Sequence, residues 1–305
     1  MGYDHRTKAG NQADVAKHAA LIVLIARRLS AGTGSGPIRY ADVCAGPARS
    51  PAAHSPGLPD GAGHLASALA LWPRLMRGSI PRELRWFVDR YAPPRRAAWK
   101  TYPGSSTIVA DLCADSRAPL ALTAWDIAPD AAASLREALG RNPGVTVHAR
   151  AATPADEGVT RADVLLLDPP GIGERFGLRL ADLADIARAA PPAAWTLIWL
   201  PILEGAEGDD AAARAWIGSL ADPSLPPPRA LGVRWPSRPS HGKMVGCLLV
   251  LRAVPDGPAI AVRSLLSWLA RHVFTGAHAW SIESIGSWPA DTRPGGTRFG
   301  MSAER

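Results

Sequence analysis

Cysteine is scarce in this chain of 305 residues, which contains only Cys44, Cys113 and Cys247. No two of them have the Cys-x-x-Cys spacing of a metal or redox motif. An odd, sparse set of this kind does not make a disulfide framework or a structural zinc site. We therefore expect neither, and no metal at the functional site.

Long apolar runs are also missing. The run at 19–26 is too short to span a bilayer and is typical of part of an amphipathic helix. Residues 1–6 are polar, and no signal-type hydrophobic block follows them. The sequence therefore predicts a soluble cytoplasmic protein without a membrane partner.

Charge of one sign is never concentrated in a run, although 34 Lys and Arg against 27 Asp and Glu give a formal net charge of +7. This excess is compatible with a polyanionic partner such as RNA but does not require one. Hydrophobic residues make up 47% of the chain, enough for one large domain or two small ones with a real core.

A short apolar run, 164–167, is the centre of the fold prediction. It is too short and too uniformly apolar for an amphipathic helix, so it indicates a strand buried on both faces. Asp168 follows it, and then Pro169, Pro170 and Gly171 end the strand. Because ligands bind outside the carboxyl ends of strands in open α/β sheets, Asp168 is a candidate for chemistry. A capping Asp before an ordinary Pro-Pro turn is the structural alternative.

The N-terminal residues 3–18 are rich in side chains that donate, accept or titrate. Asn11 or Asp14 can cap a helix from about residue 13 to residue 29, on which Asp14, Lys17 and His18 share a face. A solvated helical face behind a disordered tail is the alternative. The following strand, 38–44, leads into a turn of small residues, the usual place for a nucleotide-type cofactor.

The rest of the chain alternates between strands and helices. Segments 65–76 and 81–91 have helical periodicity and indicate a helical insertion, whose aromatic residues are more typical of a core than of a base-stacking platform. Ser105 or Ser106 can cap a helix to about residue 114, and helix N-termini bind anions such as a ligand carboxylate. Further strands are predicted at 120–125, 145–149, 164–167, 195–200, 229–235 and 246–251, and further helices at 130–140, 178–190, 209–220 and 259–271.

These elements predict an α/β fold, a doubly wound sheet of seven strands whose final pair is antiparallel. We assign 1–49 and 101–285 to the main domain and 50–100 to a helical insertion subdomain after the first strand. The segment 286–305, rich in Gly, Pro, Ser and Arg, is predicted to be a loose tail.

Several stretches together resemble the 23S rRNA adenine-N6 methyltransferase J family. The matching motifs are Tyr3-x-His5, Ala9-Gly10-Asn11-x-Ala13-Asp14-Val15-x-Lys17-His18, Asp42-x-x-Ala45-Gly46-x-x-Arg49, Tyr102-Pro103-Gly104-Ser105, Leu122-Thr123, Asp168-Pro169-Pro170 and Trp199-x-Pro201. The resemblance implies a class I, Rossmann-like methyltransferase fold, S-adenosylmethionine as cofactor, and methyl transfer to an adenine amine of ribosomal RNA.

The resemblance also implies roles for single residues. Asp168 and the carbonyl of Pro169 would polarise the acceptor amine. The substrate would be bound by Tyr3, His5 and Lys17. The cofactor would be bound by His18, Asp42, Cys44, Gly46, Ser105 and Asp126, with Asp126 in place of an acid expected directly after Leu122-Thr123.

The chain departs from the family pattern at both sites. Gly171 stands where an aromatic residue normally stacks on the extruded base. Cys44 and Ala48 replace a histidine and a glycine of the first turn, and Ala124 replaces the acid expected at the ribose. The segment 150–152 has no carboxylate near the expected adenine. Two lost hydrogen bonds would weaken cofactor binding on the order of tenfold to a hundredfold.

Three functional hypotheses follow. The first is a divergent S-adenosylmethionine-dependent methyltransferase that acts on RNA adenine through Asp168. The second is a methyltransferase whose acceptor is a small molecule or a peptide amine, because Gly171 opens the pocket. The third is a non-catalytic protein that binds RNA or another partner on the same fold. A dinucleotide-dependent oxidoreductase is disfavoured because no G-x-G-x-x-G turn follows the strand at 38–44.

Overall fold

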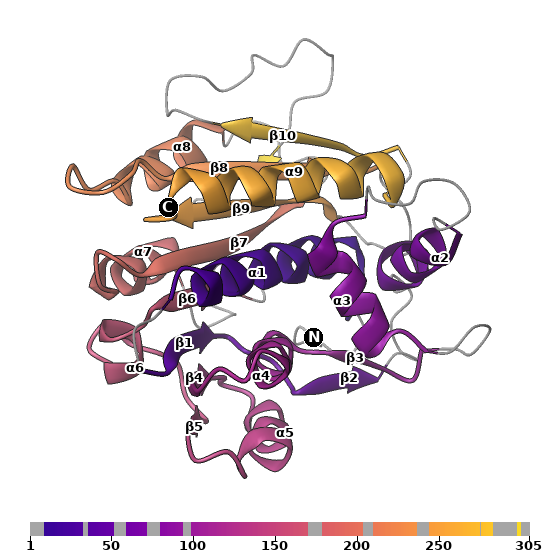
Figure 1. The fold of residues 1–305 in the computed structure, drawn as a ribbon. Coiled ribbons are helices and arrows are strands. Elements are labelled where there is room, and N and C mark those ends of the chain that lie inside the picture. The colour runs from indigo at the N-terminus through magenta and orange to yellow at the C-terminus, as the bar shows by residue number, and fades with distance from the viewer. Residues whose placement is uncertain are drawn as a thin grey trace.

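A computed structural model describes residues 9–32, 36–51, 59–71, 80–93, 99–169, 179–203, 210–236, 244–274, 276–282 and 298–299 (Figure 1). Its helices are α1 (Gln12–Ser30), α2 (His64–Leu71), α3 (Arg82–Tyr91), α4 (Ser105–Asp115), α5 (Pro129–Leu139), α6 (Glu157–Thr160), α7 (Leu180–Ala189), α8 (Asp210–Ser219), α9 (Asp256–His272) and a π-helical turn, Pro59–Gly63. Its strands are β1 (Ile38–Val43), β2 (Arg49–Pro51), β3 (Thr101–Pro103), β4 (Leu120–Trp125), β5 (Val145–His148), β6 (Val164–Leu167), β7 (Trp195–Leu203), β8 (Arg229–Arg234), β9 (Met244–Arg252), β10 (His278–Ile282) and β11 (Arg298–Phe299).

The main sheet has the strand order β10-β8-β9-β7-β6-β1-β4-β5. The pairs from β7 to β5 are parallel, whereas β9 runs antiparallel between β7 and β8. The seven predicted strands are therefore confirmed, including the antiparallel final pair. The short strands β2, β3, β10 and β11 were not predicted. The predicted tail, 286–305, lies outside the described residues except for β11, which pairs with β7.

Alternating side chains of the central strands divide the apolar core into two layers. On β6, Val164 and Leu166 pack with α1, α4 and α9, whereas Leu165 and Leu167 pack with α7 and α8 on the opposite face. All four side chains are buried, as expected for a strand covered on both faces. The helix α1 is buried along most of its length, so its predicted polar face is not a solvated one.

The insertion packs on the main core. The antiparallel pair β2–β3 forms its base, and α2 and α3 lie at the side of the sheet where the parallel strands end (Figure 1). Leu65, Leu84 and Phe87 belong to the same apolar cluster as α1. Because they share that cluster, the insertion cannot be removed without exposing α1.

The described part of the chain contains no helix that combines the length and apolar character needed to cross a bilayer. Within the same residues, no group of three or more His, Cys, Asp or Glu side chains is arranged to hold a metal ion.

Candidate functional site

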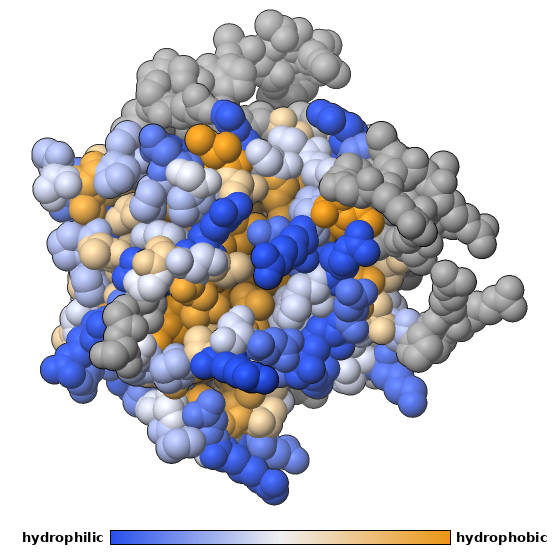
Figure 2. All heavy atoms as spheres, viewed as in Figure 1, coloured by the Kyte–Doolittle hydropathy of each residue, from blue (hydrophilic) through white to orange (hydrophobic). Residues whose placement is uncertain are grey.

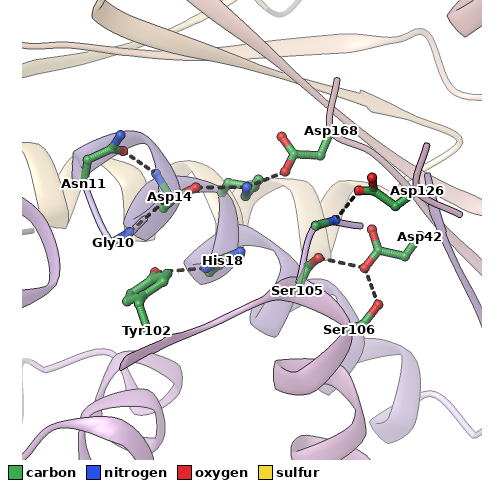
Figure 3. A network of polar contacts seen from close by, with 12 residues as sticks. Gly10, Asn11, Asp14, His18, Asp42, Tyr102, Ser105, Ser106, Asp126 and Asp168 are labelled. Carbon is green, nitrogen blue, oxygen red and sulfur yellow. Dashed lines mark hydrogen bonds and ion pairs between the residues drawn. The ribbon is translucent and has the colours of Figure 1, made fainter. Parts of the chain in front are cut away.

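A cleft lies at the carboxyl ends of β1 and β6, the point where the strand order reverses. Four segments that are distant in sequence form most of its wall: the first turns of α1, the turn after β1, the β3–α4 junction and the residues after β6 (Figure 3). Its lining residues are Ala9, Asn11, Ala13, Asp14, Lys17, His18, Cys44, Ala45, Gly46, Pro47, Ser50, Tyr102, Pro103, Gly104, Ser105, Asp168, Pro169, Trp199 and Met244.

Capping fixes the first turn of α1. The Asn11 side chain accepts a hydrogen bond from the Asp14 backbone N–H at 3.0 Å, as an N-cap residue does. Gly10, at φ +78°, donates its N–H to Oδ2 of Asp14 at 2.9 Å. The carboxylate of Asp14 is thereby held at the start of the helix, where the helix dipole favours negative charge.

Lys17 joins α1 to the end of β6. Its Nζ lies 3.0 Å from Oδ1 of Asp14 and 2.5 Å from Oδ2 of Asp168. Burial alone would lower the pKa of Lys17, but the charges of Asp14 and Asp168 outweigh it and raise this pKa. Burial would likewise raise the pKa of Asp14, but Lys17 holds it below its ordinary value. The ion pair brings together two predicted site residues that are 151 positions apart.

His18 lies beside Tyr102 on the opposite wall of the cleft. The His18 Nδ1 and the Tyr102 hydroxyl are 2.9 Å apart and the two rings stack, with centroids 5.5 Å apart. Burial, together with the neighbouring charge of Lys17, lowers the pKa of His18 to about 3. His18 is therefore a neutral imidazole at physiological pH.

Asp42 lies behind the cleft, with no solvent exposure. Its Oδ2 accepts hydrogen bonds from the hydroxyls of Ser105 and Ser106, each at 2.7 Å. Burial raises the pKa of Asp42 to about 6 in spite of these two bonds. The prediction that Ser105 or Ser106 caps α4 is wrong, because the N-cap residue is Gly104 and both hydroxyls point to Asp42.

The turn after β1 depends on two residues with left-handed backbone. Cys44 has φ +64° and Gly46 has φ +66°. Asp126 holds this turn, since its Oδ2 accepts from the Gly46 N–H at 2.8 Å and its Oδ1 accepts from the Ala128 N–H at 2.7 Å. Burial and the nearby carboxylates, that of Asp168 first, raise the pKa of the Cys44 thiol, which stays protonated.

Most of the described site predictions come together in this cleft. Lys17, His18, Cys44, Gly46, Ser105, Asp168 and Pro169 line it. Asp42 and Asp126 are not among the lining residues; each supports a segment that does line it. Tyr3 and His5, and Gly171 after the Pro-Pro pair, lie outside the described residues.

Other residues of the cleft had no assigned site role, among them Asp14, Tyr102, Trp199 and Met244. Asp14, Tyr102 and Trp199 stand inside the matching motifs, so their positions in the sequence were a usable signal. The Lys17 Nζ lies 5.9 Å from the centroid of the Trp199 ring, which is mostly buried. Met244, at the start of β9, belongs to no motif, and only the antiparallel pairing of β9 with β7 brings it here.

Comparison with known proteins identifies the fold. No family model matches the chain, and no curated protein matches it in sequence. Protein LPL1258 from Legionella pneumophila, assigned to the family DUF519, is 17% identical to this chain and superposes with a TM-score of 0.62 over 90% of this chain and 97% of its own. The seven-stranded core, with an antiparallel final pair, is the arrangement that the pattern of strands and helices predicted. The fold is that of a class I methyltransferase.

Two further structures, with lower TM-scores, are a probable spermidine synthase and an N-methyltransferase. A probable spermidine synthase from Corynebacterium glutamicum is 13% identical over 66% of this chain and 72% of its own, with a TM-score of 0.38. The N-methyltransferase NodS from Bradyrhizobium japonicum, in complex with S-adenosylhomocysteine, is 14% identical over 50% of this chain and 74% of its own, with a TM-score of 0.30. At these scores the two likenesses add nothing about the activity of this chain.

Proposed function

We propose that this chain is an S-adenosylmethionine-dependent methyltransferase whose acceptor is the exocyclic N6 amine of an RNA adenine. One observation carries the proposal: Asp168 and Pro169 lie at the carboxyl end of β6 in the same cleft as the β1 turn and the N-termini of α1 and α4. This arrangement supports an amine-binding group beside a cofactor site at the reversal point of the sheet, where ligands bind in open α/β folds.

The donors of the cleft fit the amino-acid end of the cofactor. The N-terminus of α4 has no side-chain cap, and the first N–H groups of a helix attract a carboxylate. Neutral His18 adds a hydrogen-bonding group without a charge that would repel a sulfonium. A Cβ on Gly46 would meet nothing within 4 Å, so the face of the turn is open to a ligand.

Within the described residues, the cleft has fewer free groups for the ribose of the cofactor. Both carboxylate oxygens of Asp126, the predicted substitute for the missing acid, accept from backbone N–H groups and fix the turn after β1. A contact between Asp126 and a ribose would have to share these oxygens. When bound, S-adenosylmethionine supplies an electrophilic methyl group on a sulfonium.

The proposed roles at the acceptor follow from the weakness of an adenine amine as a nucleophile. Its lone pair is delocalised into the ring. Hydrogen bonds from the amine to the Asp168 carboxylate and to the Pro169 carbonyl would localise that lone pair on nitrogen, and the cleft would hold the amine in line with the methyl group. Lys17 fixes the orientation of the Asp168 carboxylate through its contact with Oδ2.

The test combines cofactor binding with methyl transfer. We expect calorimetry to show micromolar binding of S-adenosylmethionine and of S-adenosylhomocysteine, and radiolabelled cofactor to mark unmodified 23S rRNA. Asp168→Ala is expected to keep cofactor binding and to lose at least about a hundredfold in transfer rate, the usual effect of removing one positioned polar group. Asp185→Ala, at an exposed carboxylate of α7, is the matched control.

Two outcomes would overturn parts of this proposal. Equal transfer by Asp168→Ala and wild type would exclude the assigned role of Asp168. Transfer to small amines or peptides, with none to RNA, would exclude the RNA acceptor and leave the second hypothesis.

A second candidate function is a methyltransferase-fold protein that binds RNA without transferring a methyl group. The observation that favours it is the engagement of both Asp126 oxygens by the backbone, which removes the nearest substitute for the ribose acid. Absence of any binding at millimolar S-adenosylmethionine, with RNA binding retained, would establish this candidate over the first.

A further inference from the structure

The basic excess of the chain is concentrated in the insertion. Residues 50–100 contain eight Arg or Lys and three Asp or Glu, whereas the rest of the chain contains twenty-six and twenty-four. Five of the seven net positive charges therefore belong to about a sixth of the sequence. Four of the eight basic residues, Arg74, Arg77, Arg95 and Arg96, lie outside the described residues, and the structure describes the other four, Arg82, Arg85, Arg90 and Lys100.

The helix α3 presents basic side chains outward. Leu84 and Phe87 are buried against the core, whereas Arg82 and Arg85 are exposed on the other side of the helix. In Figure 2 hydrophilic side chains gather over the area where Figure 1 places α3. Within the described residues neither Arg82 nor Arg85 forms an ion pair. Their charges are thus available to a ligand.

Arg90 has a different role, because acids on α4 neutralise it. Its guanidinium lies 3.1 Å from Asp111 and 3.9 Å from Asp115. Trp86 donates its Nε1–H to Asp115 at 2.9 Å, and the Tyr91 hydroxyl donates to Asp111 at 2.8 Å. These bonds attach α3 to α4, so the outer side of α3, with Arg82 and Arg85, is held in a fixed position on the main domain.

The helix α3, which carries Arg82 and Arg85 on its outer side, packs with its inner side on a residue of the cleft. The ring of Phe87, on the inner side of α3, is 6.0 Å from the ring of Tyr102, which lines the cleft beside His18. Exposed Arg49 of β2 lies with its Cζ 5.7 Å from the Tyr91 ring, at the C-terminal end of α3. Lys100, also exposed, directly precedes β3.

We propose that Arg49, Arg82, Arg85 and Lys100, the basic surface, bind the phosphate backbone of the RNA whose adenine enters the cleft. The identity of this partner rests on the proposed function. Arginine guanidinium groups bind phosphate bidentately, and such contacts supply affinity and register rather than base recognition. The basic surface therefore determines how strongly RNA binds, and the cleft determines which base is methylated.

The test measures RNA affinity as a function of salt for a short hairpin RNA with adenines in its loop. Each phosphate neutralised adds about 0.7 to 0.9 to the slope of log affinity against log salt. We expect Arg82→Ala combined with Arg85→Ala to lower this slope by about 1.4 to 1.8. Arg82→Lys with Arg85→Lys should recover most of it, because the positive charges remain.

A double variant near the amino ends of two parallel strands, β5 and β6, is the matched control. Arg141 precedes β5 and Arg161 precedes β6, and both are exposed, so Arg141→Ala with Arg161→Ala removes the same charge without touching the basic surface. Its salt slope should equal that of wild type. Equal losses in the two double variants would overturn the inference, since they would indicate attraction by net charge alone.

Cofactor calorimetry on the same proteins separates this inference from the proposed function. If the Arg82 and Arg85 variant keeps the wild-type slope while cofactor binding and methyl transfer are intact, the basic surface is refuted and the function stands. If wild type neither binds S-adenosylmethionine nor transfers methyl groups, the function fails. The salt slopes then still decide whether the basic surface binds RNA.

Discussion

Lys17 is a buried cation whose two partners come from different parts of the chain. Its ammonium lies between Asp14 on its own helix and Asp168 after β6. Removing one member of a buried ion pair leaves the others uncompensated, which typically costs about 3–5 kcal/mol. The single residue thus contributes to stability as well as to the geometry of the cleft.

We therefore expect Lys17→Met to lower the free energy of unfolding by about 3 kcal/mol or more, measured by urea denaturation. Adding Asp168→Asn to this variant should recover part of the lost stability, because it removes one of the two carboxylates that Lys17→Met leaves without a cation. A loss below about 1 kcal/mol for Lys17→Met would show that solvent already screens the ion pair.

Two other buried groups have pKa shifts with opposite effects on stability. His18 has a pKa of about 3 in the folded protein and 6.5 when unfolded, so acidification from pH 6.5 to 3 protonates the unfolded chain first and lowers stability. Asp42 has a pKa of about 6 when folded and 3.8 when unfolded, so acidification from pH 6 to 4 protonates the folded protein first and raises stability.

The two contributions oppose each other between pH 4 and 6, and single variants should separate them. Relative to wild type, Asp42→Asn is expected to lose stability more steeply as the pH falls from 6 to 4, and His18→Gln less steeply. For each proton by which the folded and unfolded states differ in binding, the slope of the unfolding free energy against pH changes by about 1.4 kcal/mol per pH unit. Urea denaturation at several pH values measures these slopes, and profiles parallel to that of wild type would contradict the assigned shifts.

At the scale of single elements, α1 is the helix on which the cleft depends. Asn11 caps it, and the first two turns carry Asp14, Lys17 and His18. Its sequence pattern predicted the helix and the shared face of these three residues, and it offered Asn11 or Asp14 as the cap, of which Asn11 is the one observed. The sequence did not show that this face is buried, because burial comes from the strands and helices packed against it.

We expect Asn11→Ala to lower stability by about 1 kcal/mol, the usual value of an N-cap side chain. Ser30→Ala at the other end of α1 is the control, since the Ser30 hydroxyl bonds only within its own exposed last turn. It should change stability by less than about 0.5 kcal/mol. Similar effects of both substitutions in thermal unfolding would mean that Asn11 does not act as a cap.

The start of α4 shows where local patterns mislead. A serine directly after a turn is a common helix cap, and the sequence contains two candidates there. In the folded protein both hydroxyls bond to Asp42, which comes from a strand more than sixty residues earlier. The competing partner is a buried carboxylate, and local sequence rules contain no information about it.

At the scale of the whole molecule, the insertion and the main domain share one apolar cluster. Phe87 of α3 is 3% exposed and contacts Tyr102, at the base of the insertion. Phe87→Ala is expected to cost about 3–5 kcal/mol and to keep a single unfolding transition, with circular dichroism and tryptophan fluorescence coinciding. Ile127→Ala, at an exposed position, should cost far less. Two separate transitions would show that the insertion unfolds independently.

The sequence by itself determined the order of seven strands of the main sheet and of most helices, because hydrophobic periodicity and turn residues are local properties. It also singled out most of the polar residues that line the cleft, since the motifs that contain them are local too. Only the tertiary structure decided that Asp42 and Asp126 support the cleft from behind, that Lys17 contacts Asp168, and that Met244 lines the cleft. These facts depend on strand pairing and on burial. Both bring together side chains that lie far apart in the sequence, where spacing gives no signal of the contact.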